Sequence, residues 1–170
     1  PLFGDVEPGQ ARFATDRWRA MLLWFWGQPS PANLAKCPIT SDALANVEGL
    51  RTAFHSTLEP HASLPWHIGP YAGVLRVHLG VDVPEGGHCG IQVGRQRRQW
   101  TNAGLLVFDD TYPHTAWNRS EDERVVLFID IVRPMPYRWQ RRLNAAVLAR
   151  LARTERIRGA ARRGDEMTRR

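Results

Sequence analysis

The sequence contains little cysteine and no long apolar run. Cys37 and Cys89 are its two cysteines among 170 residues, which is too few for a disulfide framework and suits a reducing compartment such as the cytoplasm. The longest apolar run spans only residues 21–26, far short of the ~18 residues that cross a bilayer. No secretory signal peptide is recognisable, although the chain begins at Pro1 rather than Met and so leaves upstream residues open. We therefore expect a globular, cytoplasmic domain.

Lysine is almost absent, and the basic residues are concentrated in one part of the chain. Lys36 is the sole lysine, a bias that we attribute to genome composition, and the net charge is +6. Residues 133–170 hold twelve arginines against three acidic residues, a net of +9, which leaves a net of −3 for residues 1–132. Because the excess lies in the tail, the sequence argues against a nucleic-acid-binding face on the domain itself.

The length and the apolar share of 43% suit one domain with one core. We predict that residues 1–136 form this domain, with a helical and irregular part at 1–50 and a strand-rich core at 51–134. A basic segment follows at 137–170. In the first part, the spacing of Trp18, Leu22 and Phe25 or Trp26 predicts a helix. Breaker residues follow at 27–31, and a further helix is predicted from Ser41 to a stop at Gly49.

The central residues predict strands separated by turns. The segment at 74–83 alternates, with Leu75, Val77, Leu79 and Val81 on one face and Arg76, His78 and Gly80 on the other. The segment at 124–132 alternates too, with Val125, Leu127, Ile129 and Ile131 on one face and Arg124, Val126, Phe128 and Asp130 on the other. Since side chains alternate along a strand, the charged ones point into one space. We also predict a turn at 84–87, an exposed arginine-rich hairpin tip at 95–98 and a short buried strand at 105–108.

These patterns favour a mainly β fold, a double-stranded β-helix (jelly roll, cupin-like) with flanking N-terminal and C-terminal helices. At the C-terminus, Trp139, Leu143, Val147 and Leu151 recur every four residues among arginines, which predicts an amphipathic helix at 137–163. Beyond Gly159 we expect fraying. The pattern leaves open whether this helix packs on the barrel or makes peripheral contact with an anionic membrane.

Six histidines occur, and their arrangement singles out two of them. A lone histidine is usually structural or exposed, and we expect His55, His61 and His88 to be surface residues, although His61 could border a pocket. His67 lies just before a predicted strand, and His114 follows the short strand that ends at residue 108. In a jelly roll these two positions converge at one end. The sequence therefore predicts a two-histidine metal site at His67 and His114.

Two imidazoles on one side of a metal, with positions left open, are typical of non-haem iron oxygenases. The usual third ligand is a carboxylate two residues after the first histidine, and Gly69 occupies that position. Arg124 follows at the head of a strand, where a guanidinium can bind a carboxylate through paired hydrogen bonds. The alternative for Arg124 and Arg76 is ordinary ion pairing with Asp109, Asp110 or Asp130.

Five segments resemble the catalytic domain of the aspartyl/asparaginyl β-hydroxylases and of the related bacterial lipid A hydroxylase. They are STLEP at 56–60, WHIGP at 66–70, LRVHLG at 75–80, FDDTYPH at 108–114 and RVVLF at 124–128. They occur in the right order, and the resemblance extends over residues 54–134. A resemblance of this extent and order is specific for the family.

The resemblance implies an Fe(II)- and 2-oxoglutarate-dependent dioxygenase that uses O₂ to hydroxylate an unactivated C–H bond. His67 and His114 match the two iron ligands, and Arg124 matches the arginine that binds the far carboxylate of 2-oxoglutarate. The positions that match further co-substrate contacts are Ser56, Arg76 and His78. Gly69 matches the glycine that replaces the acid in the animal enzymes, so water or an anion would fill the coordination position that it vacates.

The substrate is open to several interpretations. The resemblance points first to the β-carbon of an aspartyl or asparaginyl group, whether free, in a peptide or on a carrier protein. A lipid acyl chain is an alternative, and a non-enzymatic cupin-like metal-binding or scaffold domain is a third. The helical-repeat domain of the animal enzymes has no counterpart in these residues, and neither do the membrane spans of the lipid A hydroxylases. We therefore expect a small-molecule, peptide or lipid substrate, with Trp66 and Trp117 as candidates for its binding site.

Overall fold

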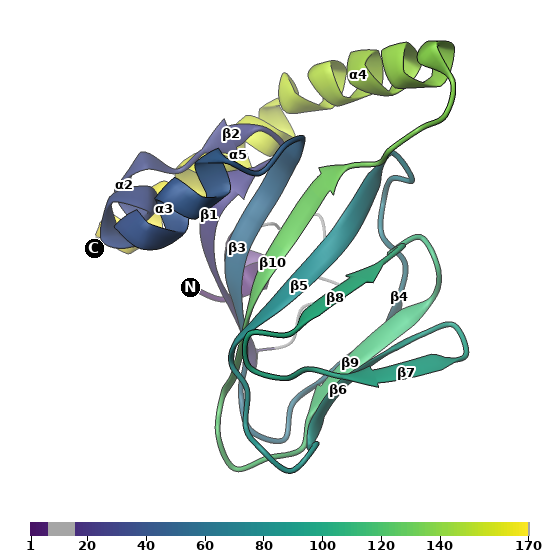
Figure 1. Ribbon diagram of the computed structural model, residues 1–170. Coiled ribbons are helices and arrows are strands. Elements are labelled where there is room, and N and C mark those ends of the chain that lie inside the picture. Colours follow the sequence, from purple (N-terminus) through teal and green to yellow (C-terminus); the bar gives the residue numbers. More distant parts are fainter. Residues whose placement is uncertain (7–15, 170) are drawn as a thin grey trace.

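The computed structural model describes residues 1–6 and 16–169. Its two facing antiparallel sheets confirm the predicted mainly β, cupin-like jelly roll (Figure 1). The strands are β1 (Trp18–Phe25), β2 (Gln28–Pro29), β3 (Leu50–Leu58), β4 (Ser63–His67), β5 (Val74–Asp82), β6 (Cys89–Val93), β7 (Gln96–Gln99), β8 (Leu105–Phe108), β9 (His114–Asn118) and β10 (Arg124–Val132). The helices are α1 (Phe3–Val6), α2 (Pro31–Lys36), α3 (Pro38–Ala45), α4 (Arg138–Ala152) and α5 (Glu155–Arg169).

The described strands form a larger sheet in the order β2-β1-β3-β10-β5-β8 and a smaller one in the order β4-β9-β6-β7. Alternation along β10 divides the apolar side chains between two cores. Val126 and Phe128 pack inward in a cluster that includes Leu64 and Ala116 of the smaller sheet. Leu127 and Ile129 pack outward with Leu44 of α3, in a second cluster. The predicted faces of β5 and β10 are confirmed, and the face that carries the charged residues is the inner one.

The helix predicted around Trp18 is wrong, because these residues form strand β1. β1 pairs with β3, and its register shifts between Leu22 and Trp24. This irregularity places Trp18, Leu22 and Phe25 in one buried cluster although they are four and then three residues apart, a spacing that imitates a helix. Leu23 is buried in the other cluster, so the strand lacks the apolar–polar alternation of a half-exposed strand. Residues 7–15 of the same predicted part lie outside the described residues.

Two shorter predictions also have different outcomes in the structure. Helix α3 begins at Pro38 rather than at Ser41, since proline is favoured at the first helical position. It ends at Ala45, whereas Gly49 has a φ of +72° and its carbonyl accepts a hydrogen bond from the Val132 amide. Strand β8 exists as predicted but is not buried, because it is the edge strand of the larger sheet, with Leu105 and Val107 more than half exposed.

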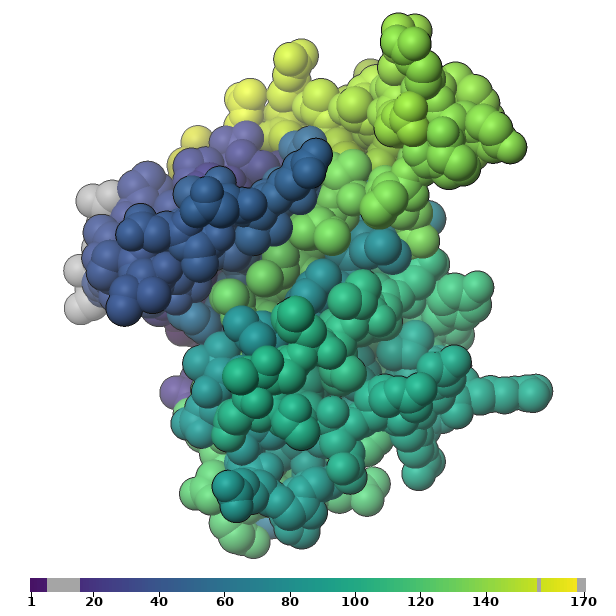
Figure 2. Space-filling model, in the orientation of Figure 1, coloured from purple at the N-terminus to yellow at the C-terminus, as the bar shows by residue number. Residues whose placement is uncertain are grey.

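The C-terminal residues form two helices rather than one. α4 ends at Ala152, and α5 continues to Arg169, so the fraying predicted beyond Gly159 is wrong. Ile157, Ala160 and Ala161 of α5 are buried in the same cluster as the inner side chains of β1. α4 buries only Asn144 and Leu148 and contributes no residue to that cluster. It forms the light-green ridge at the upper right of the space-filling view (Figure 2). None of the described helices is long and apolar enough to cross a membrane.

Candidate active site

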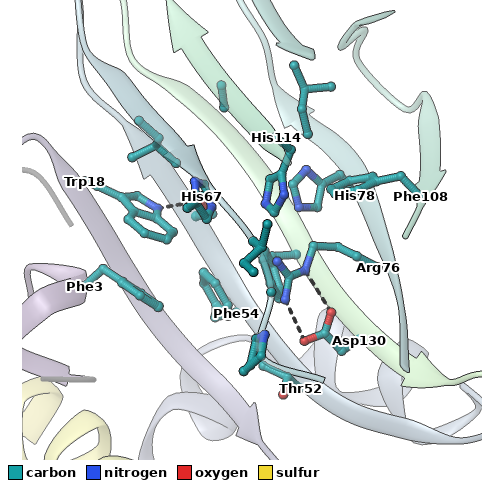
Figure 3. Close-up of a pocket in the computed structure, with 18 of the residues that line it drawn as sticks. Phe3, Trp18, Thr52, Phe54, His67, Arg76, His78, Phe108, His114 and Asp130 are labelled. Carbon is teal, nitrogen blue, oxygen red and sulfur yellow. Dashed lines mark hydrogen bonds and ion pairs between the residues drawn. The ribbon is translucent and has the colours of Figure 1, made fainter. Parts of the chain in front are cut away.

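The structure brings His67 and His114 together. His67 ends β4 and His114 begins β9, and these residues are paired across the two antiparallel strands. The centroids of their rings are 4.1 Å apart. Figure 3 shows both imidazoles at the centre of the cavity. Strand pairing thus places the two histidines at one end of the smaller sheet, although 46 residues of chain lie between them.

Each of the two imidazoles has its tautomer set by a backbone carbonyl two residues earlier. Nδ1 of His67 donates to the Pro65 carbonyl at 2.8 Å, and Nδ1 of His114 donates to the Tyr112 carbonyl at 2.9 Å. Because a carbonyl can only accept, the proton is on Nδ1 and the lone pair is on Nε2, which is the arrangement of a histidine that binds metal. Burial lowers the pKa of both rings, that of His114 to about 4, which favours the neutral forms.

Gly69 leaves room for the carboxylate of another residue. A β-carbon added at Gly69 would overlap the carboxyl group of Asp110, which is fully buried and comes from the loop before β9. Nη2 of Arg76 lies 2.9 Å from Asp110 Oδ2, and burial raises the pKa of Asp110. The sequence interpretation did not predict that the Asp110 carboxyl group fills the space beside Gly69. The only sequence signal for it was the position of Asp110, four residues before His114. In the described chain no three His, Cys, Asp or Glu side chains are grouped as a metal site.

This contact predicts the effect of changing Gly69. Gly69→Asp should destabilise the fold by about 1–3 kcal/mol through overpacking, and repulsion between two buried carboxylates adds to that loss. The double variant Gly69→Asp/Asp110→Ala should recover much of the stability, because it removes the carboxylate that is in the way. Thermal unfolding of both variants tests the prediction, and a wild-type melting temperature for Gly69→Asp would contradict it.

Arg124 is a buried cation that has no carboxylate partner among residues 1–6 and 16–169. Its side chain is 2% exposed, Nη1 donates to the Ser56 carbonyl at 3.2 Å, and the guanidinium lies 4.6 Å from the centre of the Trp100 ring. Its Nε has no hydrogen-bond partner, and no acidic residue of the described chain forms an ion pair with it. Burial lowers the pKa of Arg124 to about 10. A buried guanidinium with no counter-charge is unfavourable unless an anion binds it.

His78 and Ser56 lie on the same inner face as Arg124. Both nitrogens of the buried His78 ring lack hydrogen-bond partners in the described chain. Burial, together with the charges of Arg76 and Arg124, holds the pKa of His78 well below its usual value. The Ser56 hydroxyl accepts a hydrogen bond from Trp18 Nε1 at 2.9 Å, which leaves its own proton to be donated. Polar atoms buried in this way indicate a binding site for a polar ligand.

Arg76, in contrast, forms ion pairs with two carboxylates. Its Nε donates to Asp130 Oδ1 at 2.9 Å and its Nη2 to Asp130 Oδ2 at 3.1 Å, in addition to the contact with Asp110. The ion-pairing alternative that the sequence left open therefore applies to Arg76 and not to Arg124. Arg76 still lines the cavity, so a contact with a bound co-substrate stays a prediction.

His67, His114, Arg124, His78, Ser56 and Arg76 line one cavity, together with a set of aromatic rings. The cavity has a volume of about 60 Å³, which exceeds the ~10–15 Å³ that one water needs. Figure 3 shows Phe3, Trp18 and Phe54 on one side and the imidazoles of His114 and His78 on the other. The rings of Phe3 and Trp18 are stacked with their centroids 3.9 Å apart. The cavity thus combines a polar side with an apolar one.

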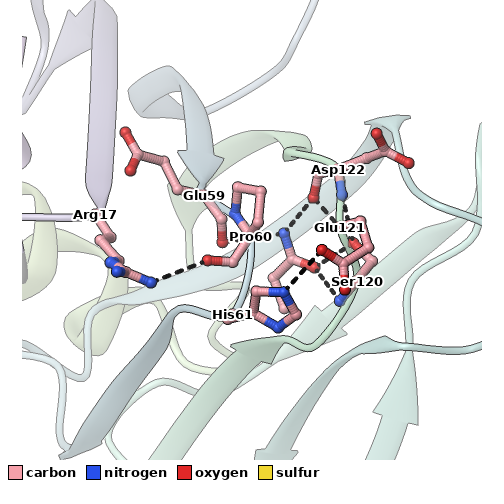
Figure 4. A network of polar contacts seen from close by, with 8 residues as sticks. Arg17, Glu59, Pro60, His61, Ser120, Glu121 and Asp122 are labelled. Atoms are coloured by element: carbon pink, nitrogen blue, oxygen red, sulfur yellow. Dashed lines mark hydrogen bonds and ion pairs between the residues drawn. The ribbon is translucent and has the colours of Figure 1, made fainter.

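The remaining histidines and the candidate tryptophans lie outside this cavity. His61 is exposed, and its Nε2 lies 3.1 Å from Glu121, in the surface network of Figure 4. His55 points to the outer face of β3 and His88 is exposed, so none of the three lines the cavity. Trp66 and Trp117 are not among the lining residues either.

The two facing sheets define a cupin-like jelly roll whose cavity holds a pair of neighbouring imidazoles. The model of the aspartyl/asparaginyl beta-hydroxylase family matches residues 3–134, and the chain belongs to this family of hydroxylases. A cupin domain of an XRE family transcriptional regulator from Enterobacter cloacae is a distant structural neighbour, with a TM-score of 0.48 and 14% identity over 70% of this chain and 100% of that one.

Two curated relatives differ in their named activities. The ornithine lipid ester-linked acyl 2-hydroxylase of Rhizobium tropici is 43% identical over 137 residues, which are 79% of this chain and 49% of that protein. The human aspartyl/asparaginyl beta-hydroxylase is 27% identical over 135 residues, 76% of this chain and 18% of that protein. The chain therefore spans half or less of the length of these relatives.

Proposed function

We propose that the protein is an Fe(II)- and 2-oxoglutarate-dependent oxygenase that hydroxylates an acyl chain of a lipid. The observation that carries the cofactor assignment is the presence, in one cavity, of two neutral imidazoles and a buried guanidinium that lacks a counter-charge within the part of the chain that the structure describes. The imidazoles suit Fe(II), and the guanidinium suits a carboxylate of the co-substrate. The donor set therefore fits both groups.

His67 and His114 would hold the iron through Nε2, each oriented by its Nδ1 hydrogen bond. Arg124 would bind the far carboxylate of 2-oxoglutarate, with the Ser56 hydroxyl and His78 as further donors. When bound, iron, 2-oxoglutarate and O₂ supply the oxidising chemistry. The ion pair with Arg76 holds the Asp110 carboxyl group against Gly69, where it fills space that a halide ligand would need, and this supports hydroxylation over transfer of a halogen.

Two observations support an acyl substrate over an aspartyl one. The relative named as a lipid acyl 2-hydroxylase is 43% identical, whereas the human aspartyl/asparaginyl enzyme is 27% identical. The aromatic side of the cavity, formed by Phe3, Trp18 and Phe54 among others, suits an alkyl chain better than a carboxylate. β-Hydroxylation of an aspartyl or asparaginyl group is the alternative.

The test is product analysis of the purified protein under aerobic conditions with Fe(II) and 2-oxoglutarate. We expect succinate formation that depends on added Fe(II), and a mass increase of one oxygen in a detergent-dispersed acyl lipid. A parallel reaction with aspartyl and asparaginyl peptides should give no product. Hydroxylated peptide with unmodified lipid would overturn the substrate assignment, and absence of succinate with every substrate would overturn the oxygenase assignment.

A further inference from the structure

Helix α4 presents an apolar surface to solvent. Tyr137, Trp139 and Leu143 are 61%, 64% and 58% exposed, whereas the buried residues of this helix are Asn144 and Leu148. Trp139 and Leu143 are one helical turn apart and so form a continuous patch. The predicted apolar stripe of the helix thus faces outward at its N-terminal end, along the ridge seen in Figure 2. Exposed apolar patches of this kind mark interaction sites.

The charge around this patch has one sign. α4 carries Arg138, Arg141, Arg142 and Arg150 and no acidic residue. Arg141 donates to the carbonyls of Met135 and Pro136. The guanidinium groups of the other three are exposed and have no ion pair or hydrogen bond within the described chain. Tryptophan and leucine among exposed arginines are complementary to a bilayer surface, where anionic headgroups lie over acyl chains.

α4 is tied to the segment that forms part of the cavity mouth. The buried Asn144 side chain donates to the Gly73 carbonyl at 2.9 Å and accepts from the Tyr71 hydroxyl at 2.6 Å. A β-carbon at Gly73 would collide with the Asn144 side chain, so glycine permits this close approach. The segment that contains Tyr71 and Gly73 begins at His67. It includes Ile68, which lines the cavity and is also more than half exposed. The position of α4 is therefore coupled to the entrance of the site.

We propose that α4 binds the surface of an anionic lipid bilayer and thereby holds the cavity mouth against the membrane. The docking rests on the proposed function, because it names the surface from which the acyl substrate is taken. The interaction needs neither metal nor turnover, so it can be measured by itself. Its physical basis is insertion of Trp139 and Leu143 into the interface, with the arginines close to the headgroups.

The test is co-flotation of the 170-residue chain with vesicles of phosphatidylcholine alone or mixed with phosphatidylglycerol. We expect binding to the mixed vesicles that weakens as salt is added. Trp139→Ala/Leu143→Ala should reduce the partition coefficient by about tenfold or more. Arg138→Gln/Arg142→Gln should reduce it by roughly fivefold for each arginine. The matched control is Arg97→Gln/Arg98→Gln, which removes the same charge from the exposed strand β7 and should bind like the wild type.

Equal binding by the Trp139→Ala/Leu143→Ala variant and the wild type would overturn the docking. So would a concentration-dependent dimer that the same variant abolishes, combined with no vesicle binding, since the patch would then contact a second copy. Hydroxylation of a detergent-dispersed lipid without vesicle binding would overturn the docking and leave the proposed function intact. Vesicle binding without succinate formation would overturn the proposed function and leave the docking intact.

Discussion

Replacement of His67 or His114 by alanine is expected to abolish tight binding of Fe(II). Removal of groups that only orient a metal ligand typically weakens affinity by 10–100-fold, so loss of a ligand itself should exceed about 100-fold. Each variant also leaves a single imidazole, because no third His, Cys, Asp or Glu side chain of the described chain is grouped with the pair as a metal site. Anaerobic calorimetric titration with Fe(II), or with a redox-inert divalent ion, measures the loss.

The controls are His61→Ala and His88→Ala. Both side chains are exposed and outside the cavity, and the contact between His61 and Glu121 is a surface interaction that contributes little to stability. These variants should bind metal with wild-type affinity. Undiminished affinity in both His67→Ala and His114→Ala would refute the metal site.

Replacement of Arg124 by methionine is expected to weaken the binding of 2-oxoglutarate without lowering the stability of the fold. Loss of one partner of a desolvated charge pair typically costs about 2–5 kcal/mol, so 2-oxoglutarate should bind at least about tenfold more weakly. Stability without co-substrate should not fall, because the variant removes a buried charge that has no counter-charge among the described residues. Folding holds the pKa of Arg124 below its usual value, and the resulting penalty is present at every pH below about 10.

Arg76→Met is the comparison that makes this result informative. The Arg76 side chain is only 13% exposed, but it pairs with Asp130 and Asp110. Its removal leaves two buried carboxylates without their cation and should destabilise the protein by about 3–5 kcal/mol. Thermal unfolding without ligand and 2-oxoglutarate titration of metal-loaded protein should therefore rank the two variants in opposite orders. An Arg124→Met variant with wild-type 2-oxoglutarate dependence would show that another residue binds the carboxylate.

The fold was predictable where one face of a strand is polar and the other apolar. In β5 and β10 the alternation was visible in the sequence, and it placed Arg76, His78 and Arg124 on one face. It was not visible in β1, where both faces are buried and a register shift imitates helical spacing. The sequence also did not predict that the C-terminal residues divide into two helices, α4 and α5. Nor did the apolar period show which side of α4 the rest of the protein covers.

The sequence predicted which residues form the candidate site, but not which contacts those residues make with one another. The spacing of His67, His114 and Arg124 indicated that they converge, and the structure brings all three to one cavity. Which arginine has a counter-charge depends on three-dimensional neighbours, so the sequence left this open for Arg76 and Arg124. The occupation of the space beside Gly69 by Asp110 depends on the path of the loop before β9, which the residue pattern does not specify.

The packing of α5 has a practical consequence for anyone shortening this protein. The sequence shared with the family stops at residue 134, and a truncation there would look conservative in an alignment. It would remove Ile157, Ala160 and Ala161 from the apolar cluster and leave Leu22, which lies beside Gly164, without the helix that covers it. Such a fragment would expose apolar surface on the larger sheet, and we expect it to aggregate on expression. We therefore expect the smallest unit that folds to extend beyond residue 134 and to include α5.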